Sequence, residues 1–416
     1  MTTHRIAGID VHKKMLAVVV LDAAEEGEWR LHRRKFLTTA KDLDALAEWL
    51  ALLEVREVVM ESTAQYGKPV WRVLEPQCHM ELAQAQSNRG PRGRKNDFAD
   101  AERLVRRYVA EELILSFVPD PQQRLWRALS RTKQTLTRDR VRLQNRVEGL
   151  LEEMCLKLSS VVSDLLGVSA RRMLTALSEG ETDPAKLAAM AEPGLRATPE
   201  RLCDALRAAP SLYPGYRHLL KQYLERIQLQ DRHIAELDRE LGVALKEHED
   251  AVVRLADVPG LGADSAQQII AEVGPQAAPF PTAANLCSWV GSCPGQEESA
   301  EQSTSDHSPK GNRSMRRILN QAANAAIKTK GTVFEAHYRR IRGRDPKKHN
   351  VAVWAVANRL CRLIWKILHH NVKYEERGSR PNPKAVRKRA RRLVRQLRAL
   401  GYCVQVSPPQ PQAGTA

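Results

Sequence analysis

The chain has 416 residues, 43% of them hydrophobic and 28% charged, which is enough apolar material for packed cores and argues against a disordered protein. Lys and Arg number 66 against 49 Asp and Glu, and the net charge of +17 favours a polyanionic partner, most commonly nucleic acid, over a generically basic protein. No apolar run approaches the ~20 residues that span a bilayer, and the first residues lack a signal-peptide layout. We therefore expect a cytoplasmic protein with no membrane partner.

The first part of the chain, residues 1–118, has the pattern of an α/β domain. Apolar and alternating runs predict strands at Ile6–Asp10, Met15–Leu21, Trp29–Leu37 and Glu57–Met60. Leucines three and four apart predict a helix over residues 41–53, before the last of these strands. Three strands, a helix and a further strand is the opening order of a ribonuclease-H-like fold, although other α/β folds begin in the same way.

The next part, residues 119–250, is predicted to be a long helical region. Apolar residues recur every seven positions in two stretches: Leu129, Leu136, Leu143 and Leu150, then Leu220, Ile227, Ile234 and Leu241. Such heptads favour a coiled coil or helical bundle, either within one chain or between subunits. The segment between them, residues 178–214, is expected to contain connecting helices and loops.

Two further regions complete the chain. Residues 251–372 are predicted to form a mostly α-helical domain, and residues 373–416 a basic tail. The stretch from Arg377 to Arg398 carries ten Lys and Arg and no acidic residue. Its polar end is expected to be disordered.

Four carboxylates stand at the predicted ends of elements. Asp10 closes the first strand and Glu61 follows a later strand, while Asp97 and Asp100 are three apart at the start of a predicted helix. In a ribonuclease-H-like sheet the first and fourth strands are neighbours, so all four side chains would converge. Oxygen ligands from several elements suit Mg²⁺ or Mn²⁺. The alternative is structural: Asp10 as a turn residue, Glu61 as a strand-end cap, and Asp97 as a helix N-cap with Asp100 three positions on.

Several basic or glycine-rich segments are candidates for nucleic-acid contacts. A basic run precedes the acidic helix, a glycine-rich turn at Val258–Ala266 resembles a helix-hairpin-helix hairpin, and a polar loop runs from Cys293 to Arg317. Each segment also has a structural alternative. The glycine-rich turn would be a closely packed helix–helix turn, the polar loop an ordinary surface loop, and the basic stretch from Arg377 to Arg398 a solvated tail. The candidate residues are Arg92, Arg94, Lys95, Gly260, Gly262, Lys310, Arg313, Arg316, Arg317, Arg387, Lys388, Arg391 and Arg392.

The order of the short motifs resembles one known family. GIDVHKK, the EST-x-QY segment at Glu61 and GRKNDFADAERL resemble the DEDD signature of the IS110 family of transposases and recombinases, which are relatives of the Piv DNA invertases. VPGLG, CPGQEESA, KGNRSMRRIL and AIKTKGT resemble the family's C-terminal transposase domain, especially its CPGxxES subgroup. Together these motifs cover residues 5–370.

The resemblance carries specific expectations. It implies a RuvC-like N-terminal domain whose metal-binding quartet is Asp10, Glu61, Asp97 and Asp100, and it implies that Ser299 is the nucleophile that becomes joined to DNA. It further implies a homo-oligomer, dimer to tetramer, in a bacterial or archaeal cell, associated with the nucleoid. The partners would be donor DNA, target DNA and a structured non-coding guide RNA.

Three functions from different classes follow from these observations. The leading interpretation is a DNA recombinase that cuts and rejoins strands. A metal-dependent, junction-resolvase-like nuclease would need the carboxylates but not Ser299. A nucleic-acid-binding protein from a degenerate element would need neither.

Overall fold

The computed structural model divides the chain into two compact units, residues 1–120 and residues 121–416. It describes residues 5–23, 29–63, 65–85, 87–88, 96–293, 297–299, 302–305, 308, 310–376, 378 and 383–405. Among these residues, no helix has the length and apolar character needed to cross a membrane.

The first unit is built on a five-stranded sheet. Its strands are β1 (Arg5–Val11), β2 (Met15–Ala23), β3 (Trp29–Leu37), β4 (Glu57–Ser62) and β5 (His79–Leu82). They lie in the order β3-β2-β1-β4-β5, with β1, β2 and β3 antiparallel and β4 and β5 added in parallel to β1. The prediction that the first and fourth strands are neighbours is confirmed, and each predicted strand lies within two residues of its observed bounds.

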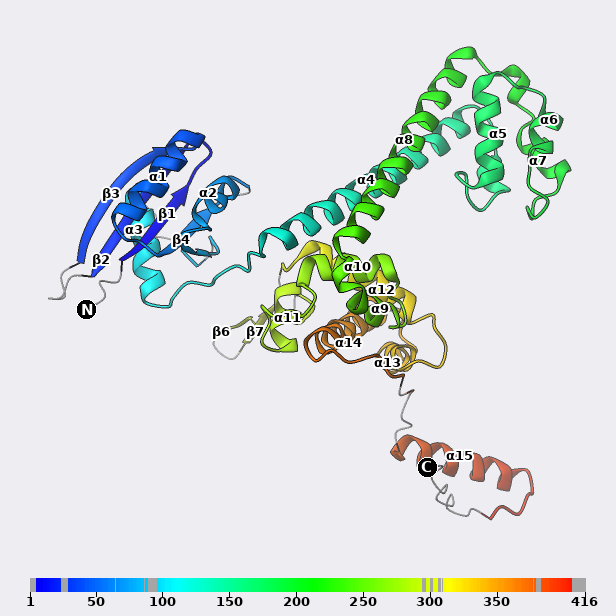
Figure 1. The fold of residues 1–416 in the computed structure, drawn as a ribbon. Helices are drawn as coiled ribbons and strands as arrows, with labels where there is room; N and C mark the ends of the chain where they lie inside the picture. The colour runs from blue at the N-terminus through cyan, green and yellow to red at the C-terminus, as the bar shows by residue number, and fades with distance from the viewer. Residues whose placement is uncertain are drawn as a thin grey trace. The chain divides into compact units, whose positions relative to one another are not determined.

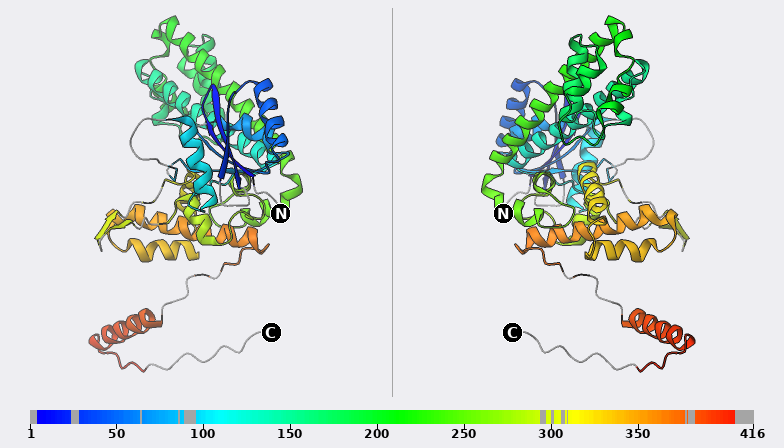
Figure 2. Two further views of the ribbon diagram at one scale, coloured as in Figure 1. Left: turned by 90° about the vertical axis from the view of Figure 1, so that its left-hand side faces the viewer. Right: turned by 90° about the vertical axis from the view of Figure 1, so that its right-hand side faces the viewer.

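Alternation along the strands gives the sheet two different faces. Ile9 and Val58 point to one face, where they form a core with α1 (Ala40–Leu52) and α2 (Gly67–Leu74). Ile6 and Val59 point to the other face and pack with α3 (Asp97–Val109). The helices therefore form a layer on each side of the sheet (Figures 1 and 2).

A glycine in β1 permits the close approach of α3. A Cβ atom on Gly8 would lie 2.3 Å from Cγ2 of Val105 and 2.6 Å from the carbonyl oxygen of Ala101, both in α3. No side chain fits there, so the helix packs directly on the strand backbone. Arg33 and Glu102, with nitrogen and oxygen 2.7 Å apart, tie the same helix to β3.

Two long helices pack along one another in the second unit. α4 (Pro121–Glu153) and α8 (Pro214–Ala244) bury Leu143 and Ile227 and share ion pairs between Lys133 and Asp238 and between Arg140 and Asp231. Figure 1 shows the two helices running side by side. Of the two alternatives for the heptad stretches, the structure shows pairing within one chain.

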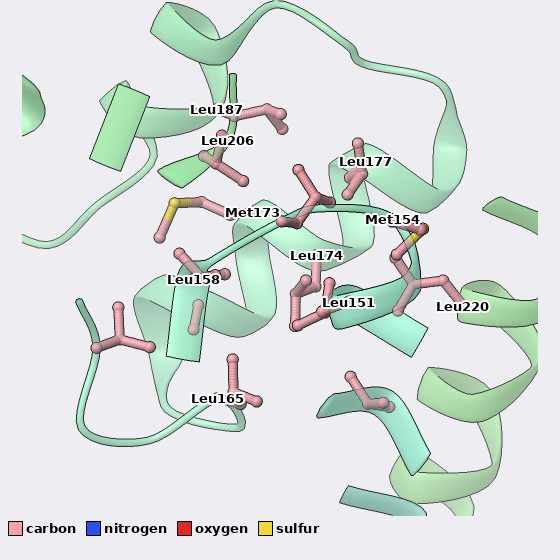
Figure 3. Packing of buried hydrophobic residues seen from close by; sticks show 14 of the residues in the cluster. Leu151, Met154, Leu158, Leu165, Met173, Leu174, Leu177, Leu187, Leu206 and Leu220 are labelled. Atoms are coloured by element: carbon pink, nitrogen blue, oxygen red, sulfur yellow. The ribbon is translucent and has the colours of Figure 1, made fainter. Parts of the chain in front are cut away.

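The segment between these helices shares a buried core with the end of α4 and the first half of α8. It contains η1 (Leu158–Ser160), α5 (Val168–Glu179), α6 (Pro184–Ala189), α7 (Pro199–Ala205) and η2 (Ala209–Ser211). Leu158, Met173, Leu187, Leu206 and Leu220 are buried together there (Figure 3). The predicted connecting helices and loops are present, and they pack together as a small helical cluster against α8.

The remaining elements are mostly helical, as predicted, with one short hairpin that the sequence did not indicate. They are η3 (Lys246–His248), α9 (Glu249–Ala256), α10 (Ala263–Val273), α11 (Ala283–Val290), β6 (Glu297–Ser299), β7 (Gln302–Ser305), α12 (Arg313–Ala326), α13 (Val333–Arg342), η4 (Pro346–Lys348), α14 (His349–His369) and α15 (Pro383–Ala399).

A buried carboxylate joins three of the helical segments. Glu272 of α10 is fully buried and accepts hydrogen bonds from Arg131 of α4, at 2.7 and 2.8 Å, and from Nδ2 of Asn312, at 3.0 Å. Burial by itself would raise the pKa of Glu272, but these donors and Arg127 lower it below the usual value. The carboxylate therefore stays charged and holds α4, α10 and the start of α12 together.

Replacing Gly8 by alanine tests the close packing of α3 on β1. We expect Gly8→Ala to destabilise the first unit by about 1–3 kcal/mol, because the added methyl group overpacks the contact with Val105. Native-state hydrogen exchange should show faster opening in peptides from β1 and α3. Gly149→Ala is the control, since a Cβ there meets nothing within 4 Å, and it should stabilise α4 by about 0.5–1 kcal/mol. Unchanged exchange in Gly8→Ala would contradict the packing argument.

Candidate active site

Two of the predicted carboxylates lie opposite each other on neighbouring strands. Asp10 of β1 pairs in register with Glu61 of β4. Both side chains belong to the sheet face covered by α3, because Gly8 and Val59, two residues earlier on the same strands, contact that helix layer. The Asp10 side chain is only 17% exposed.

The start of α3 brings the other two carboxylates to this face. The N-cap is Asn96, whose side chain accepts a hydrogen bond from the backbone N–H of Phe98 at 3.1 Å, so the alternative of Asp97 as N-cap is wrong. Asp97 and Asp100 consequently sit in the first turn, where the helix dipole favours negative charge. Asp100 forms an ion pair with Arg103.

The other three carboxylates act on the pKa of Asp10 through their charge, although in the described part of the chain only Asp10 and Asp97 of the four join His12 in a group of ligand atoms within 4.8 Å of one another. Burial raises the pKa of Asp10 above its ordinary value, His12 opposes the rise, and the charges of Glu61, Asp100 and Asp97 add to it. Asp10 is thus a partly buried carboxylate on which three further negative charges act. Such a site is suited to a cation.

Three residues around the carboxylates were not predicted. Nε2 of His12 lies 3.1 Å from Asp10 and 3.4 Å from Asp97, and Nζ of Lys35 lies 3.4 Å from Asp97. Asn88, which is buried, donates from Nδ2 to Glu61 at 2.7 Å. His12 could have been found from its position two residues after Asp10, but nothing in the sequence marks Lys35 or Asn88.

The donor set fits a divalent metal ion. Asp10, His12 and Asp97 each offer a ligand atom within 4.8 Å of the others. Carboxylate oxygens are the ligands preferred by Mg²⁺ and Mn²⁺. The pKa of Asp10 is raised first by its burial and then by the negative charges of Glu61, Asp100 and Asp97.

The predicted nucleophile lies in the second unit. Ser299 ends β6 and pairs with Gln302 of β7 in the short hairpin. Only the backbone of this hairpin is among the described features, and Ser303 and Ser305 lie on its other strand. Of the basic run before α3, Arg92, Arg94 and Lys95 lie outside the described residues.

The two glycines of the glycine-rich turn, Gly260 and Gly262, have different structural surroundings. Gly260 has φ +88°, and a Cβ there would lie 2.3 Å from the carbonyl oxygen of Ala322, so close packing on α12 explains this glycine. Gly262 is the N-cap of α10 and has open space around its Cα. Phosphate contact at both positions remains a prediction.

The basic residues around the start of α12 divide into two groups. The guanidinium of Arg316 donates to the carbonyl of Gly291 and lies 4.4 Å from the ring centroid of Trp354. Arg317 is half-buried and donates to Gln268 and, at 2.8 Å, to Gln321. Lys310 and Arg313 are exposed. The structure thus gives Arg316 and Arg317 intramolecular contacts that the sequence did not reveal.

Basic residues of α15 lie on an exposed helix. Arg387, Arg391 and Arg392 are exposed, and Lys388 belongs to the helix but its side chain is outside the described set. Leu393 and Leu397 of the same helix are also exposed.

Neutralising Asp10 should stabilise the metal-free protein. Because the folded-state pKa of Asp10 is raised, its contribution to stability is fully present below the unfolded pKa and is lost as the pH rises through the folded pKa. In EDTA, Asp10→Asn should therefore gain about 0.5–2 kcal/mol at neutral pH, with the gain vanishing in acid. Urea denaturation across pH measures this. The exposed Asp44→Asn control should show no such trend, and a destabilised Asp10→Asn would contradict the explanation.

Comparisons with known proteins agree with the two-part motif pattern. Residues 7–156 match a transposase family, that of the DEDD transposases of IS110, and residues 253–339 match the transposase IS116/IS110/IS902 family. A probable family 20 transposase of Pseudomonas aeruginosa is 25% identical over 68% of this chain and 75% of its own length. The transposase for insertion sequence element IS1328 of Yersinia enterocolitica is 24% identical over 66% of this chain and 71% of its own.

A third relative is a protein of an insertion element. The insertion element IS110 uncharacterized 43.6 kDa protein of Streptomyces coelicolor is 27% identical over 59% of this chain and 62% of its own length. The two matched families cover the sheet that carries the carboxylates and part of the later helical region, residues 253–339. The chain belongs to the IS110 family of transposases, enzymes that act on DNA.

Proposed function

We propose that this transposase cuts and rejoins DNA strands with a metal-bound quartet, Asp10, Glu61, Asp97 and Asp100, and with Ser299 as nucleophile. The observation that supports the metal site best is geometric: Asp10 lies opposite Glu61 in the strand register and has a ligand atom within 4.8 Å of those of His12 and Asp97. The strand order β3-β2-β1-β4-β5 supports a ribonuclease-H-like, RuvC-like first domain.

The quartet would hold Mg²⁺ or Mn²⁺, with His12 beside Asp10 and Asp97. When bound, such ions polarise the scissile phosphate and stabilise the charge that develops on its oxygens. Asn88 orients Glu61 through its hydrogen bond of 2.7 Å, and Arg103 restrains Asp100. These contacts keep the carboxylate oxygens in place before DNA arrives.

The strand transfer proceeds through a phosphoserine. The Ser299 hydroxyl oxygen attacks phosphorus and loses its proton, while the bond from phosphorus to a deoxyribose oxygen breaks and that oxygen takes up a proton. A serine hydroxyl at its ordinary pKa is a poor nucleophile, so it requires activation at the acidic site. The covalent link conserves the phosphodiester energy, and a second strand's hydroxyl then displaces the serine.

The wider organisation follows from the family resemblance. The proposed domains are residues 1–118, a coiled-coil region at 119–250, a transposase domain at 251–372 and a basic tail. We infer a dimer to tetramer in which the quartet and Ser299 come from different subunits. A non-coding guide RNA would pair with donor and target DNA.

A nuclease without a covalent intermediate is the second candidate. The observation in its favour is that the quartet lies wholly within residues 1–120, which form one of the two units. In that case water would replace Ser299 as the attacking group.

Trapping the covalent intermediate separates these two functions. With a nicked suicide substrate and Mg²⁺, the wild type should form a denaturant-resistant protein–DNA adduct that peptide mapping places at Ser299. Asp10→Ala and Glu61→Ala should each lower cleavage by on the order of a hundredfold or more, with DNA binding retained. Ser299→Ala should lose both adduct and recombination.

Neighbouring serines provide matched controls for this experiment. Ser303→Ala and Ser305→Ala, in β7, should keep the adduct. Mixing Ser299→Ala with Asp10→Ala protein should restore some adduct if subunits share the site. Cleavage at the normal rate by Ser299→Ala, with no adduct in the wild type, would favour the nuclease, and full activity of Asp10→Ala would refute the quartet.

The basic tail is expected to bind a phosphate backbone. Deleting residues 377–416 should weaken DNA binding and lower the slope of log K against log salt by about 0.7–0.9 for each phosphate that the tail neutralises in the full chain. Deleting only residues 406–416, which contain no Lys or Arg, is the control and should change neither quantity. Equal affinity and slope in both deletions would show that the tail is merely solvated.

A further inference from the structure

The connection between α13 and α14 concentrates positive charge. We call residues Arg339–Lys348 the basic turn, because six of these ten residues are Lys or Arg and one, Asp345, is acidic. Arg339, Arg340, Arg344, Lys347 and Lys348 are exposed. Most of this segment lies beyond the matched family region, which ends at residue 339.

The charges at the tip of the basic turn are not neutralised within the chain. Among the described residues, no carboxylate forms an ion pair with Arg344, Lys347 or Lys348. The nearest acid, Asp345, instead accepts a hydrogen bond from the backbone N–H of Lys347 at 3.0 Å. Three exposed cations therefore remain available to an external anion.

The basic turn is held in shape without a ligand. The hydroxyl of Tyr338 and Nδ1 of His349 are 2.7 Å apart, which joins α13 to the start of α14 across the turn. Backbone N–H groups of Gly343 and Lys348 donate to the carbonyl oxygens of Arg339 and Asp345. A preorganised group of charges loses less conformational entropy on binding than a mobile tail does.

The surroundings of the basic turn are positive as well. His337 of α13 has a lowered pKa, first because it is buried and then because of the charges of Arg340 and Arg359. Arg359 of α14 contributes to this positive field. Against the effect of burial, its charge also helps to lower the pKa of Glu376, which accepts a hydrogen bond from the backbone N–H of Val333. The flanking helices thus add to the attraction for a polyanion.

We propose that the basic turn is a DNA-backbone binding site, in which Arg344, Lys347 and Lys348 contact phosphates of duplex DNA without reading its sequence. The inference rests on the proposed function, in which DNA is the substrate. Three exposed cations without a carboxylate partner among the described residues, carried on a turn whose backbone is fixed by hydrogen bonds, suit a phosphate backbone with closely and regularly spaced charges. The aromatic rings beside the turn, Tyr338 and His349, contact each other, whereas recognition of single-stranded RNA stacks bases on accessible aromatic faces.

A triple substitution with a charge-matched control tests the site. The test variant is Arg344→Ala, Lys347→Ala and Lys348→Ala together. The control is Arg196→Ala, Arg201→Ala and Arg207→Ala, which removes the same charge from exposed positions in the α6–α7 region, where acidic residues are interspersed. Binding to a linear DNA duplex and to the same sequence as duplex RNA is measured across a salt series with the full chain.

The test variant should bind duplex DNA on the order of a hundredfold more weakly at low salt, with a salt slope lower by about 2–3, while the control keeps both near wild type. Wild-type affinity and slope in the test variant, equal losses in both variants, or a loss confined to RNA would each overturn the inference. The suicide-substrate adduct of the wild type is scored separately. Its absence refutes the proposed function, whereas the binding comparison decides the basic turn alone.

Discussion

The direct packing of α3 on the backbone of β1 is the contact on which the acidic site depends. It exists because residue 8 has no side chain, so that Val105 and Ala101 of α3 occupy the space of a Cβ atom. Alternation along β1 then places Asp10 on the same face, two residues beyond Gly8. A larger residue at position 8 would lift α3 and move Asp97 away from Asp10, although every carboxylate would still be present in the sequence.

Gathering these carboxylates has a cost in stability that the surrounding cations reduce only in part. Lys35 and His12 lie near Asp97, and Arg103 pairs with Asp100, yet the pKa of Asp10 remains raised. Without a metal ion, the ionised Asp10 therefore lowers the free energy of unfolding, and a cation bound to the folded site would raise it again. We expect a neutral residue at position 10 to favour the metal-free fold, which is the conflict between stability and function that charged sites commonly show.

The strands and the carboxylates could be predicted from the sequence because both depend on local patterns. The alternation along β1 and β4 indicates which side chains share a face of the sheet, and the spacing of Asp97 and Asp100 indicates the start of a helix. The N-cap named in the structural alternative was wrong, because it is Asn96 and not Asp97. His12 was within reach of the argument from alternation. Asn88 and Lys35 were not, because they reach the site only through the tertiary path of the chain, and the hairpin bearing Ser299 has no alternating apolar pattern to announce it.

The basic residues likewise depend on tertiary structure, because their number in the sequence does not indicate which of them are free to contact DNA. Arg316 and Arg317 belong to a motif that suggests phosphate binding. The guanidinium of Arg316, however, donates to the carbonyl of Gly291 and lies over the ring of Trp354, and that of Arg317 donates to Gln268. Arg131 is committed to Glu272 in the same way. A guanidinium group held in such contacts is less free to reach a phosphate, but its charge still adds to the overall field of the protein. Cations that the fold leaves exposed and without a carboxylate partner in the described part of the chain, such as those in the turn between α13 and α14, are therefore the candidates for direct contact with phosphates.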